Sequence, residues 1–174
     1  MKSVLIANRG EIAVRIIRTC KEMGIRTVQV YSEADSDSLA VKIADEGINI
    51  GPPQALKSYL NHDVILEAAR LSKVEAIHPG YGFLSENAEF AAKVEKTGIT
   101  FLGPNSESIQ ILGDKVEARK LAIEAGVTVV PGTEGGVSTV DDAILFASQI
   151  GFPVMIKAAA GGGGRGIRVA ENTK

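Results

Sequence analysis

The sequence predicts an α/β protein in which a doubly wound, mostly parallel sheet is followed by the start of a second domain. Short apolar runs alternate with amphipathic helical stretches through the first part of the chain. Strands that recur roughly 20–30 residues apart, with helices between them, are typical of parallel crossovers in an open sheet. After Gly103 and Pro104 this alternation gives way to a long helical stretch and then to glycine-rich loops, which indicates a change of domain.

Five strands and four helices are predicted in the first part. The strands occupy short apolar runs at 3–7, 27–31, 47–50, 76–78 and 100–102. The helices lie between successive strands, over 11–23, 38–44, 61–71 and 87–96. The first helix has an apolar stripe formed by Ile12, Ile16, Cys20 and Met23. Gly24 is expected to cap its end, and Ser38 is placed to cap the second helix.

Three loops follow predicted strands directly, at 8–10, 32–33 and 79–82. Because the carboxyl ends of parallel strands meet at one edge of the sheet, we expect these loops to lie together. Ligands of doubly wound sheets bind at that edge. The first part of the chain is therefore expected to carry its ligand site there.

The second part begins with a helical stretch over 106–125 that is interrupted at Gly113, where Asp114 can cap the second piece. A glycine- and proline-containing loop from 126 to 136 follows and is a plausible domain junction. A helix over 139–150 has an acidic first turn, which the helix dipole favours. Strands are then expected at 153–158 and 167–170, on either side of a glycine run.

The glycine run at 161–164 is predicted to be the turn of a hairpin that holds phosphate. It matches the dinucleotide pattern GxGxxG, but no helix follows it, and Ile167 stands where a Walker loop has lysine. Glycines let backbone N–H groups approach phosphate closely. Lys157 interrupts an apolar run, where a buried unpaired ammonium is costly and a phosphate would be its partner. A mobile hairpin tip and a lysine that reaches solvent are the alternatives.

Composition and charge exclude several classes of protein. The chain has 174 residues, a net charge of −2 and no basic stripe, which argues against a nucleic-acid partner. Cys20 is the single cysteine, so no internal disulfide forms, and an inert buried thiol in a reducing cytosol is expected. No apolar segment has the length of a membrane span or a signal peptide. A cytoplasmic protein with no membrane partner is predicted.

Four segments together resemble biotin carboxylase, the ATP-dependent component of acetyl-CoA, propionyl-CoA, methylcrotonyl-CoA and pyruvate carboxylases. They occur in the family's order and cover essentially the whole chain: NRGEIA at 8–13, HPGYGFLSEN at 78–87, GDK at 113–115, and IKA at 156–158 with the glycines up to 166. The ten-residue match at 78–87 is highly specific. The glycine run alone is not.

The resemblance implies an enzyme of the ATP-grasp class with three regions in this chain. Residues 1–112 correspond to the N-terminal α/β domain, 113–132 to a helix and linker, and 133–174 to an incomplete flap that closes over ATP. Lys115 and Lys157 match lysines that contact the nucleotide, and Gly163 and Gly164 match the closing loop. Tyr81 and Gly82 match residues that border the ureido ring of biotin, and they also fit a tight turn after a strand.

The implied chemistry has two steps. ATP with Mg²⁺ activates bicarbonate as carboxyphosphate, and biotin on a carrier protein or domain then takes up the CO₂ that is released. The resemblance also implies a carboxyltransferase partner and a homodimer formed through the first helix, whose polar face carries Arg15, Arg18 and Glu22. As isolated charges these three would simply be solvated. A mitochondrial matrix location is the alternative to the cytoplasm.

The chain also departs from the family pattern. The family's metal-binding glutamates, bicarbonate-binding arginine and general base lie beyond the glycine loop, so no catalytic or metal-binding residue is assigned within this chain. We therefore expect a fragment that is inactive by itself, with exposed sheet edges in the flap. Another ATP-grasp ligase and a non-catalytic dimerisation or folding module remain the alternatives. The segment 78–87 argues against the other ligases, because a tyrosine at that turn suits biotin.

Overall fold

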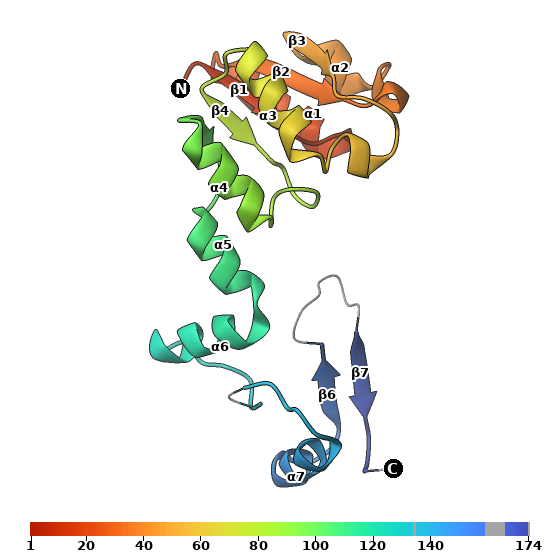
Figure 1. Cartoon of the computed structure of the whole chain (residues 1–174), viewed down its shortest axis with the longest axis vertical. Coiled ribbons are helices and arrows are strands. Elements are labelled where there is room, and N and C mark those ends of the chain that lie inside the picture. The colour runs from red at the N-terminus through yellow and green to blue at the C-terminus, as the bar shows by residue number, and fades with distance from the viewer. Residues whose placement is uncertain (134, 159–165, 174) are drawn as a thin grey trace. The chain divides into compact units, whose positions relative to one another are not determined.

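The computed structural model of the chain describes residues 1–133, 135–158 and 166–173, and it divides into two compact units. The first unit is Met1–Ile109 and the second is Gln110–Lys174. Figure 1 shows the elements of both units along the chain. Each unit is described by itself below.

The first unit is built on a five-stranded parallel sheet, as predicted. Its strands are β1 (Ser3–Ile6), β2 (Arg26–Tyr31), β3 (Glu46–Asn49), β4 (Ala76–His78) and β5 (Thr100–Phe101). Their order is β3-β2-β1-β4-β5, and every neighbouring pair is parallel. The chain thus winds outward from β1 in both directions, which confirms the doubly wound α/β fold.

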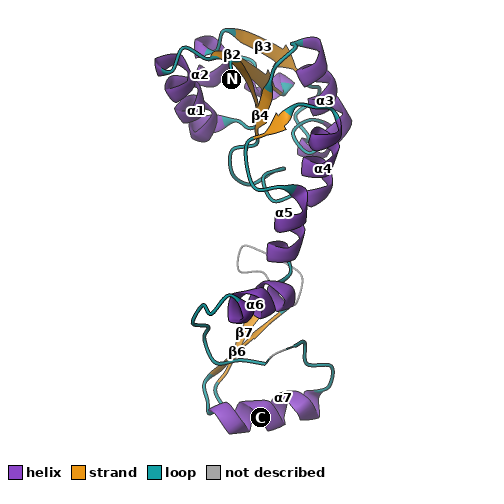
Figure 2. Cartoon of the chain, turned by 90° about the vertical axis from the view of Figure 1, so that its left-hand side faces the viewer, coloured by secondary structure: helices purple, strands orange, loops and turns teal. Residues whose placement is uncertain are grey.

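Helices cover both faces of this sheet (Figure 2). Helices α1 (Gly10–Glu22) and α2 (Leu39–Ile43) pack on one face, and α3 (His62–Leu71) and α4 (Ala88–Lys96) pack on the other. Side chains of β1 alternate between the two cores: Val4 and Ile6 join the α1 core, whereas Leu5 joins the α3–α4 core. Because both faces are covered there, the central strand β1 reads as a continuous apolar run in the sequence.

Three details of the first unit differ from the prediction. Met23 is 66% exposed, and the buried stripe of α1 consists of Ala13, Ile16, Ile17 and Cys20. Ser38 precedes α2, but its side chain makes no capping hydrogen bond. Two short 3₁₀ turns, Glu33–Asp35 and Ala55–Lys57, were not predicted, because three-residue turns have no hydrophobic period to reveal them.

The second unit contains helices and a hairpin. Helix α5 (Ser106–Gly113) crosses the boundary between the units, and α6 (Lys115–Glu124) starts behind Asp114, whose carboxylate accepts hydrogen bonds from two backbone N–H groups of α6. These hydrogen bonds lower the pKa of Asp114. Helix α7 (Val140–Ile150) starts behind Thr139, which accepts a hydrogen bond in the same way. The interruption at Gly113 and the Asp114 cap are confirmed.

The hairpin pairs β6 (Val154–Lys157) with β7 (Ile167–Ala170) in antiparallel register, with Lys157 opposite Ile167. The strand–turn–strand prediction is therefore confirmed for its two strands, and Gly163 and Gly164 lie outside the described residues. The burial expected of Lys157 is wrong. Lys157 is exposed, as are its neighbours Met155 and Ile156, because nothing in the described part of the unit covers these three side chains.

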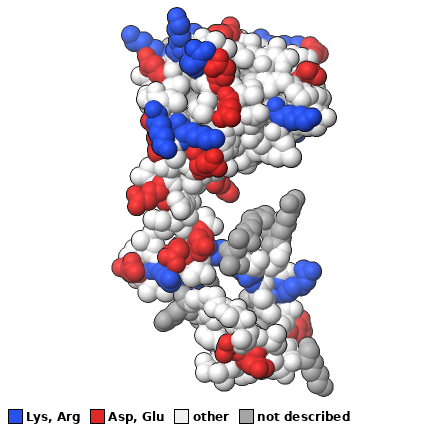
Figure 3. All heavy atoms as spheres, viewed as in Figure 1, with Lys and Arg blue, Asp and Glu red and all other residues white. Residues whose placement is uncertain are grey.

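The surface carries charges of both signs. On the face drawn in Figure 3, Lys and Arg side chains are interspersed with Asp and Glu, and the positive side chains form no stripe. Within the described ranges, no helix has both the length and the apolar composition to cross a bilayer.

Candidate functional site

The loops after β1 and β4 meet at the carboxyl edge of the sheet, as predicted. The backbone N–H of Ala7 donates to the His78 carbonyl at 2.9 Å, which brings the two loops together. From the next position, the side-chain amide of Asn8 donates to the carbonyl oxygens of Pro79 at 2.7 Å and Tyr81 at 2.8 Å. Asn8 is 4% exposed. A buried amide from one loop therefore supports the backbone of the other.

The turn at 79–82 depends on two glycines that serve different purposes. Gly80 has φ +67°, and a Cβ placed on it would lie 2.6 Å from the amide nitrogen of Asn8. Gly82 has φ +64°, but a Cβ there would meet nothing within 4 Å. Both positions need the left-handed conformation that glycine adopts freely. Gly80 is also needed because Asn8 fills the space beside it.

Tyr81 presents its ring to solvent at the centre of this turn. The residue is 60% exposed, and its phenol donates to the carboxylate of Glu11 in the first turn of α1. That hydrogen bond raises the pKa of Tyr81, so the phenol stays protonated at neutral pH. Among the described residues, no acceptor takes a hydrogen bond from the backbone N–H of Tyr81 or Gly82. The turn thus offers two backbone amide donors and the exposed Tyr81 ring to a ligand.

His78 is a structural part of the turn. Its Nδ1 accepts a hydrogen bond from the N–H of Gly80 at 3.0 Å, and burial lowers the pKa of the imidazole. A neutral ring that accepts at Nδ1 carries its proton on Nε2. His78 therefore contributes no positive charge at neutral pH.

A second group of residues lies behind the turn. The loops that carry Arg9 and Ser32 were predicted to lie at this edge of the sheet, whereas Tyr59 and Asp35 were not predicted. Tyr59 is 2% exposed and stacks on Phe83 with ring centroids 5.1 Å apart. Its hydroxyl donates to Asp35 at 2.7 Å and accepts from the N–H of Ser32 at 3.0 Å. Burial raises the pKa of Tyr59 to about 12. Arg9 pairs with Asp35 at 3.6 Å and lies over the Phe83 ring. Residues that are far apart in the sequence and come into contact only in the folded chain produce no recognisable spacing pattern.

The two lysines predicted to contact nucleotide come to the same end of the hairpin in the second unit. Lys115 is the first residue of α6, and its ammonium donates to the carbonyl of Ala158 at 3.0 Å. Ala158 directly follows Lys157, and its N–H donates to the carbonyl of Gly166. Both lysines therefore lie where the glycine run begins.

A metal site was not assigned in the chain from its sequence. Among the described residues, no group of three or more His, Cys, Asp or Glu side chains is close enough to hold a metal ion. The described residues therefore form no site built from protein ligands alone for a Mg²⁺ ion, and the function proposed below contains no step through one.

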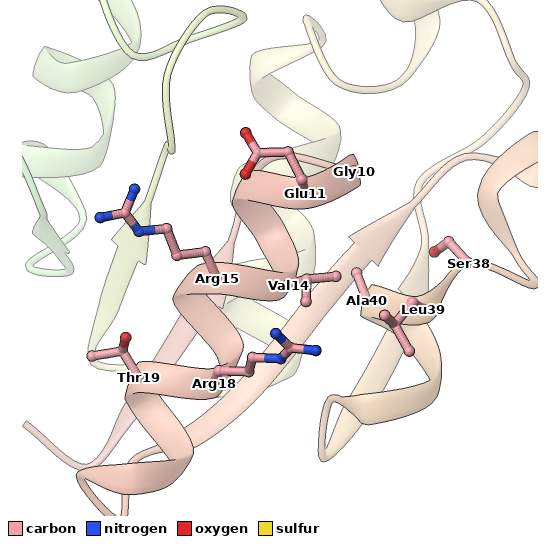
Figure 4. Close-up of a pocket in the computed structure, with 9 residues that line it drawn as sticks. All are labelled: Gly10, Glu11, Val14, Arg15, Arg18, Thr19, Ser38, Leu39 and Ala40. Carbon is pink, nitrogen blue, oxygen red and sulfur yellow. The ribbon is translucent and has the colours of Figure 1, made fainter.

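A pocket of about 530 Å³ lies between α1 and α2. Figure 4 shows Arg18 extending from α1 toward Leu39 and Ala40 of α2, and Arg15 pointing to the other side of the helix. Both arginines belong to the polar face of α1 that was predicted from the sequence to form a homodimer. Glu11, which accepts the hydrogen bond from Tyr81, lines one end of the pocket.

Comparison with known proteins places these features in a family. A family model described as biotin carboxylase, N-terminal domain, matches residues 1–109, and one described as carbamoyl-phosphate synthase L chain, ATP binding domain, matches residues 114–174. The chain belongs to the biotin carboxylase family. The resemblance predicted from the sequence is thereby confirmed.

Relatives of this family match nearly the whole chain. Biotin carboxylase 1 of Bacillus subtilis is 55% identical over 171 residues, which are 98% of this chain and 38% of the relative. The mitochondrial propionyl-CoA carboxylase alpha chain of Mus musculus is 53% identical over 167 residues, 96% of this chain and 23% of the relative. The chain thus spans well under half the length of these relatives.

Two solved structures of biotin carboxylases have the same fold. The biotin carboxylase from Campylobacter jejuni, in a complex with beta-gamma-ATP, matches with a TM-score of 0.95 and 50% identity over 99% of this chain and 39% of its own. The biotin carboxylase domain dimer of the Hydrogenobacter thermophilus 2-oxoglutarate carboxylase, in a complex with MgADP, ADP and bicarbonate, matches with a TM-score of 0.92 and 49% identity. This match covers 99% of the present chain and 38% of the 2-oxoglutarate carboxylase chain.

Proposed function

We propose that this chain supplies the biotin-binding turn and part of the ATP-binding flap of a biotin carboxylase. The enzyme carboxylates biotin on a carrier protein with bicarbonate and ATP, through carboxyphosphate. One observation carries this proposal: the 8–11 segment holds the turn at 79–82 with its amide donors available, in a chain that is 55% identical to a biotin carboxylase along almost its full length.

On the biotin side, the turn matches the chemistry of a ureido ring. A ureido group is planar and presents a carbonyl oxygen, which accepts hydrogen bonds. The backbone N–H groups of Tyr81 and Gly82 are donors at one exposed surface, beside the exposed Tyr81 ring. Gly82 has no side chain to obstruct a close approach to the backbone. These residues bind and orient the ring.

On the nucleotide side, Lys115 and Lys157 bring two positive charges to the turn end of the hairpin. Positive groups stabilise the negative charge of phosphates during phosphoryl transfer. We assign Gly163 and Gly164, which lie outside the described residues, to the loop that closes over the nucleotide. Mg²⁺ supplies further charge stabilisation when it is bound.

The proposed organisation follows from this assignment. Residues 1–112 form the N-terminal domain, 113–132 a helix and linker, and 133–174 the first part of the flap. We propose a homodimer through the exposed polar face of α1, a biotin carboxyl carrier protein or domain as substrate, and a carboxyltransferase as the consumer of carboxybiotin. The cytoplasm is the proposed compartment, and the mitochondrial propionyl-CoA carboxylase chains make the mitochondrial matrix the alternative.

The test uses a joined enzyme, defined as this chain followed by the residues of B. subtilis biotin carboxylase 1 that lie beyond the matched region. We expect ADP release that depends on both bicarbonate and biotin. Lys157→Ala removes a charge-assisted contact to phosphate and should raise the KM for ATP about tenfold or more. Lys120→Ala, on the same helix as Lys115 but paired with Glu117, is the matched control and should change little. A rate of ADP release that does not change when biotin is added would contradict the proposal.

The 174-residue chain assayed alone provides a second arm. Because its described residues offer no cluster of metal ligands, we expect no bicarbonate-dependent ADP release above background. Turnover by the chain alone would show that its residues suffice for phosphoryl transfer, and the assignment of nucleotide chemistry to further residues would then be wrong.

A further inference from the structure

We propose that Asn8 and Glu11 are positioning residues for biotin, acting as a two-point clamp on the turn at 79–82. Asn8 holds the backbone of the turn, and Glu11 holds the side chain of Tyr81. The biotin role of this clamp rests on the function proposed above, whereas the clamp itself is a statement about the geometry of this chain.

The first point of the clamp is fully engaged. The two side-chain N–H groups of Asn8 donate to the carbonyls of Pro79 and Tyr81, and its side-chain oxygen accepts from the N–H of Arg9 at 2.9 Å. These partners fix which end of the amide is oxygen and which is nitrogen. Aspartate has nearly the same shape but lacks both donors. The contacts therefore require asparagine at position 8.

Asn8 is in turn anchored in the sheet. Gln29 of β2 is 1% exposed, and its side-chain amide donates to the backbone carbonyl of Asn8 at 2.6 Å and to that of Val30 at 2.5 Å. The backbone of Asn8 is thus tied to β2, while its side chain is tied to the loop after β4. Through these hydrogen bonds, the three central strands β1, β2 and β4 restrict the movement of the turn.

The shape of the turn shows that the clamp acts on one side only. Asn8 packs against Gly80 so closely that a Cβ there would collide with its amide. On the other side, a Cβ on Gly82 would meet nothing, and the N–H groups of Tyr81 and Gly82 have no acceptor among the described residues. Asn8 therefore fixes the direction of these donors without occupying the space in front of them.

Glu11 forms the second point. Glu11 lies in the first turn of α1, and its hydrogen bond with Tyr81 joins the start of that helix to the turn at 79–82. A carboxylate is favourable there because of the helix dipole. Its acceptance of the Tyr81 phenol holds an otherwise exposed ring in one orientation. The segments 8–11 and 79–82, separate in the sequence, thus form one structural unit.

The experiment for Asn8 is amide hydrogen exchange measured by NMR on the whole 174-residue chain. In Asn8→Asp, the amides of Gly80 and Ser85, which are hydrogen-bonded within the turn region, should exchange about tenfold faster. The amides of Ala7 and Leu102, which report on the sheet, should keep their rates. Equal acceleration at all four sites would mean that Asn8 only stabilises the fold and would overturn the clamp, as would no change at any of them.

Asn61→Asp is the matched control for this substitution. Asn61 uses only its side-chain oxygen, which accepts from the N–H groups of Asp63 and Val64, and aspartate retains that acceptor. Exchange at Gly80 and Ser85 should therefore not change in Asn61→Asp. An equal response in the two variants would contradict a specific role for the Asn8 donors.

Glu11 is tested at the surface, where a substitution leaves the core intact even if Asn8→Asp fails to fold. Glu11→Gln should bring the pKa of Tyr81, followed by NMR titration of its ring, down toward its ordinary value of 10.0, because the carboxylate that favours the protonated phenol is gone. Glu22→Gln, on the exposed end of the same helix, should leave that pKa unchanged. An unchanged pKa in Glu11→Gln would overturn the second point of the clamp.

The biotin role is tested in the joined enzyme. Asn8→Asp should raise the KM for biotin about tenfold while the KM for ATP stays within about twofold of its starting value. A parallel rise in both constants would indicate general damage and contradict a positioning role. If the unmodified joined enzyme shows no biotin-dependent turnover, the proposed function fails, and with it the biotin role. The exchange and titration results still decide whether the clamp exists.

Discussion

At the scale of single residues, the turn at 79–82 shows how the Asn8 side chain restricts which residue can occupy position 80. Gly80 is required both for its positive φ and because Asn8 occupies the space that a Cβ would need. Gly82 has nearly the same φ but open space beside it. Gly82 is therefore needed only for its backbone conformation, whereas Gly80 is needed for its conformation and for the space that Asn8 occupies.

This difference predicts unequal effects of alanine at the two positions. Gly82→Ala should lower the free energy of unfolding by about 1–2 kcal/mol, the cost of a left-handed alanine. Gly80→Ala should lower it by at least about 1 kcal/mol more, because the added methyl group meets Asn8. Urea unfolding of the two variants at one temperature measures both values. Equal losses would show that Asn8 yields without cost and that the close packing is unimportant.

The residues of the site could be predicted from the sequence only in part. Tyr81 and Gly82 were identified because they belong to a specific ten-residue segment, and the structure places them at the expected edge of the sheet. The loop containing Asn8 was predicted to lie near them, but its amide contacts were not. Tyr59 and Asp35 were missed entirely, because their contacts depend on which residues the folded chain brings together and not on any local pattern.

At the scale of elements, helix starts provide a direct comparison of sequence and structure. Asn61 and Asn87 precede α3 and α4 and accept hydrogen bonds from first-turn N–H groups, as their residue type favours. Ser38 precedes α2, but only its backbone is engaged: its N–H donates to the carbonyl of Asp35, and its carbonyl accepts from the N–H of Lys42. The residue type thus predicted correctly where these helices start, but it did not predict correctly in every case that the side chain forms a capping hydrogen bond.

Alanine substitutions at these caps should differ accordingly. Asn61→Ala removes the acceptor for two N–H groups and should lower the free energy of unfolding by about 1 kcal/mol. Ser38→Ala removes no capping bond and should change it by less than about 0.5 kcal/mol. Thermal or urea unfolding monitored by circular dichroism gives both values. A larger loss for Ser38→Ala would mean that its side chain does cap α2 in solution.

At the scale of the whole molecule, the two units differ in how completely they bury apolar side chains. The first unit has apolar cores on both faces of its sheet. In the second unit, Ala147 is the one buried apolar residue among those described, and Met155, Ile156 and Val169 are exposed. The order of elements could be predicted in both units. The burial of Lys157 could not, because a strand pattern gives the alternation of side chains but not whether another layer covers them.

We propose that this chain belongs to an enzyme that carboxylates biotin, and the identity of the carboxylated product tests that proposal. The most direct measurement supplies the joined enzyme with labelled bicarbonate, ATP and a biotinylated carrier and identifies the labelled product. We expect label on the carrier's biotin, with ATP consumed in proportion. The second family model takes its description from carbamoyl-phosphate synthase, so synthesis of carbamoyl phosphate is the reaction to compare with carboxylation of biotin. Label that appears in carbamoyl phosphate when an amine donor is present, with none on biotin, would contradict the claim.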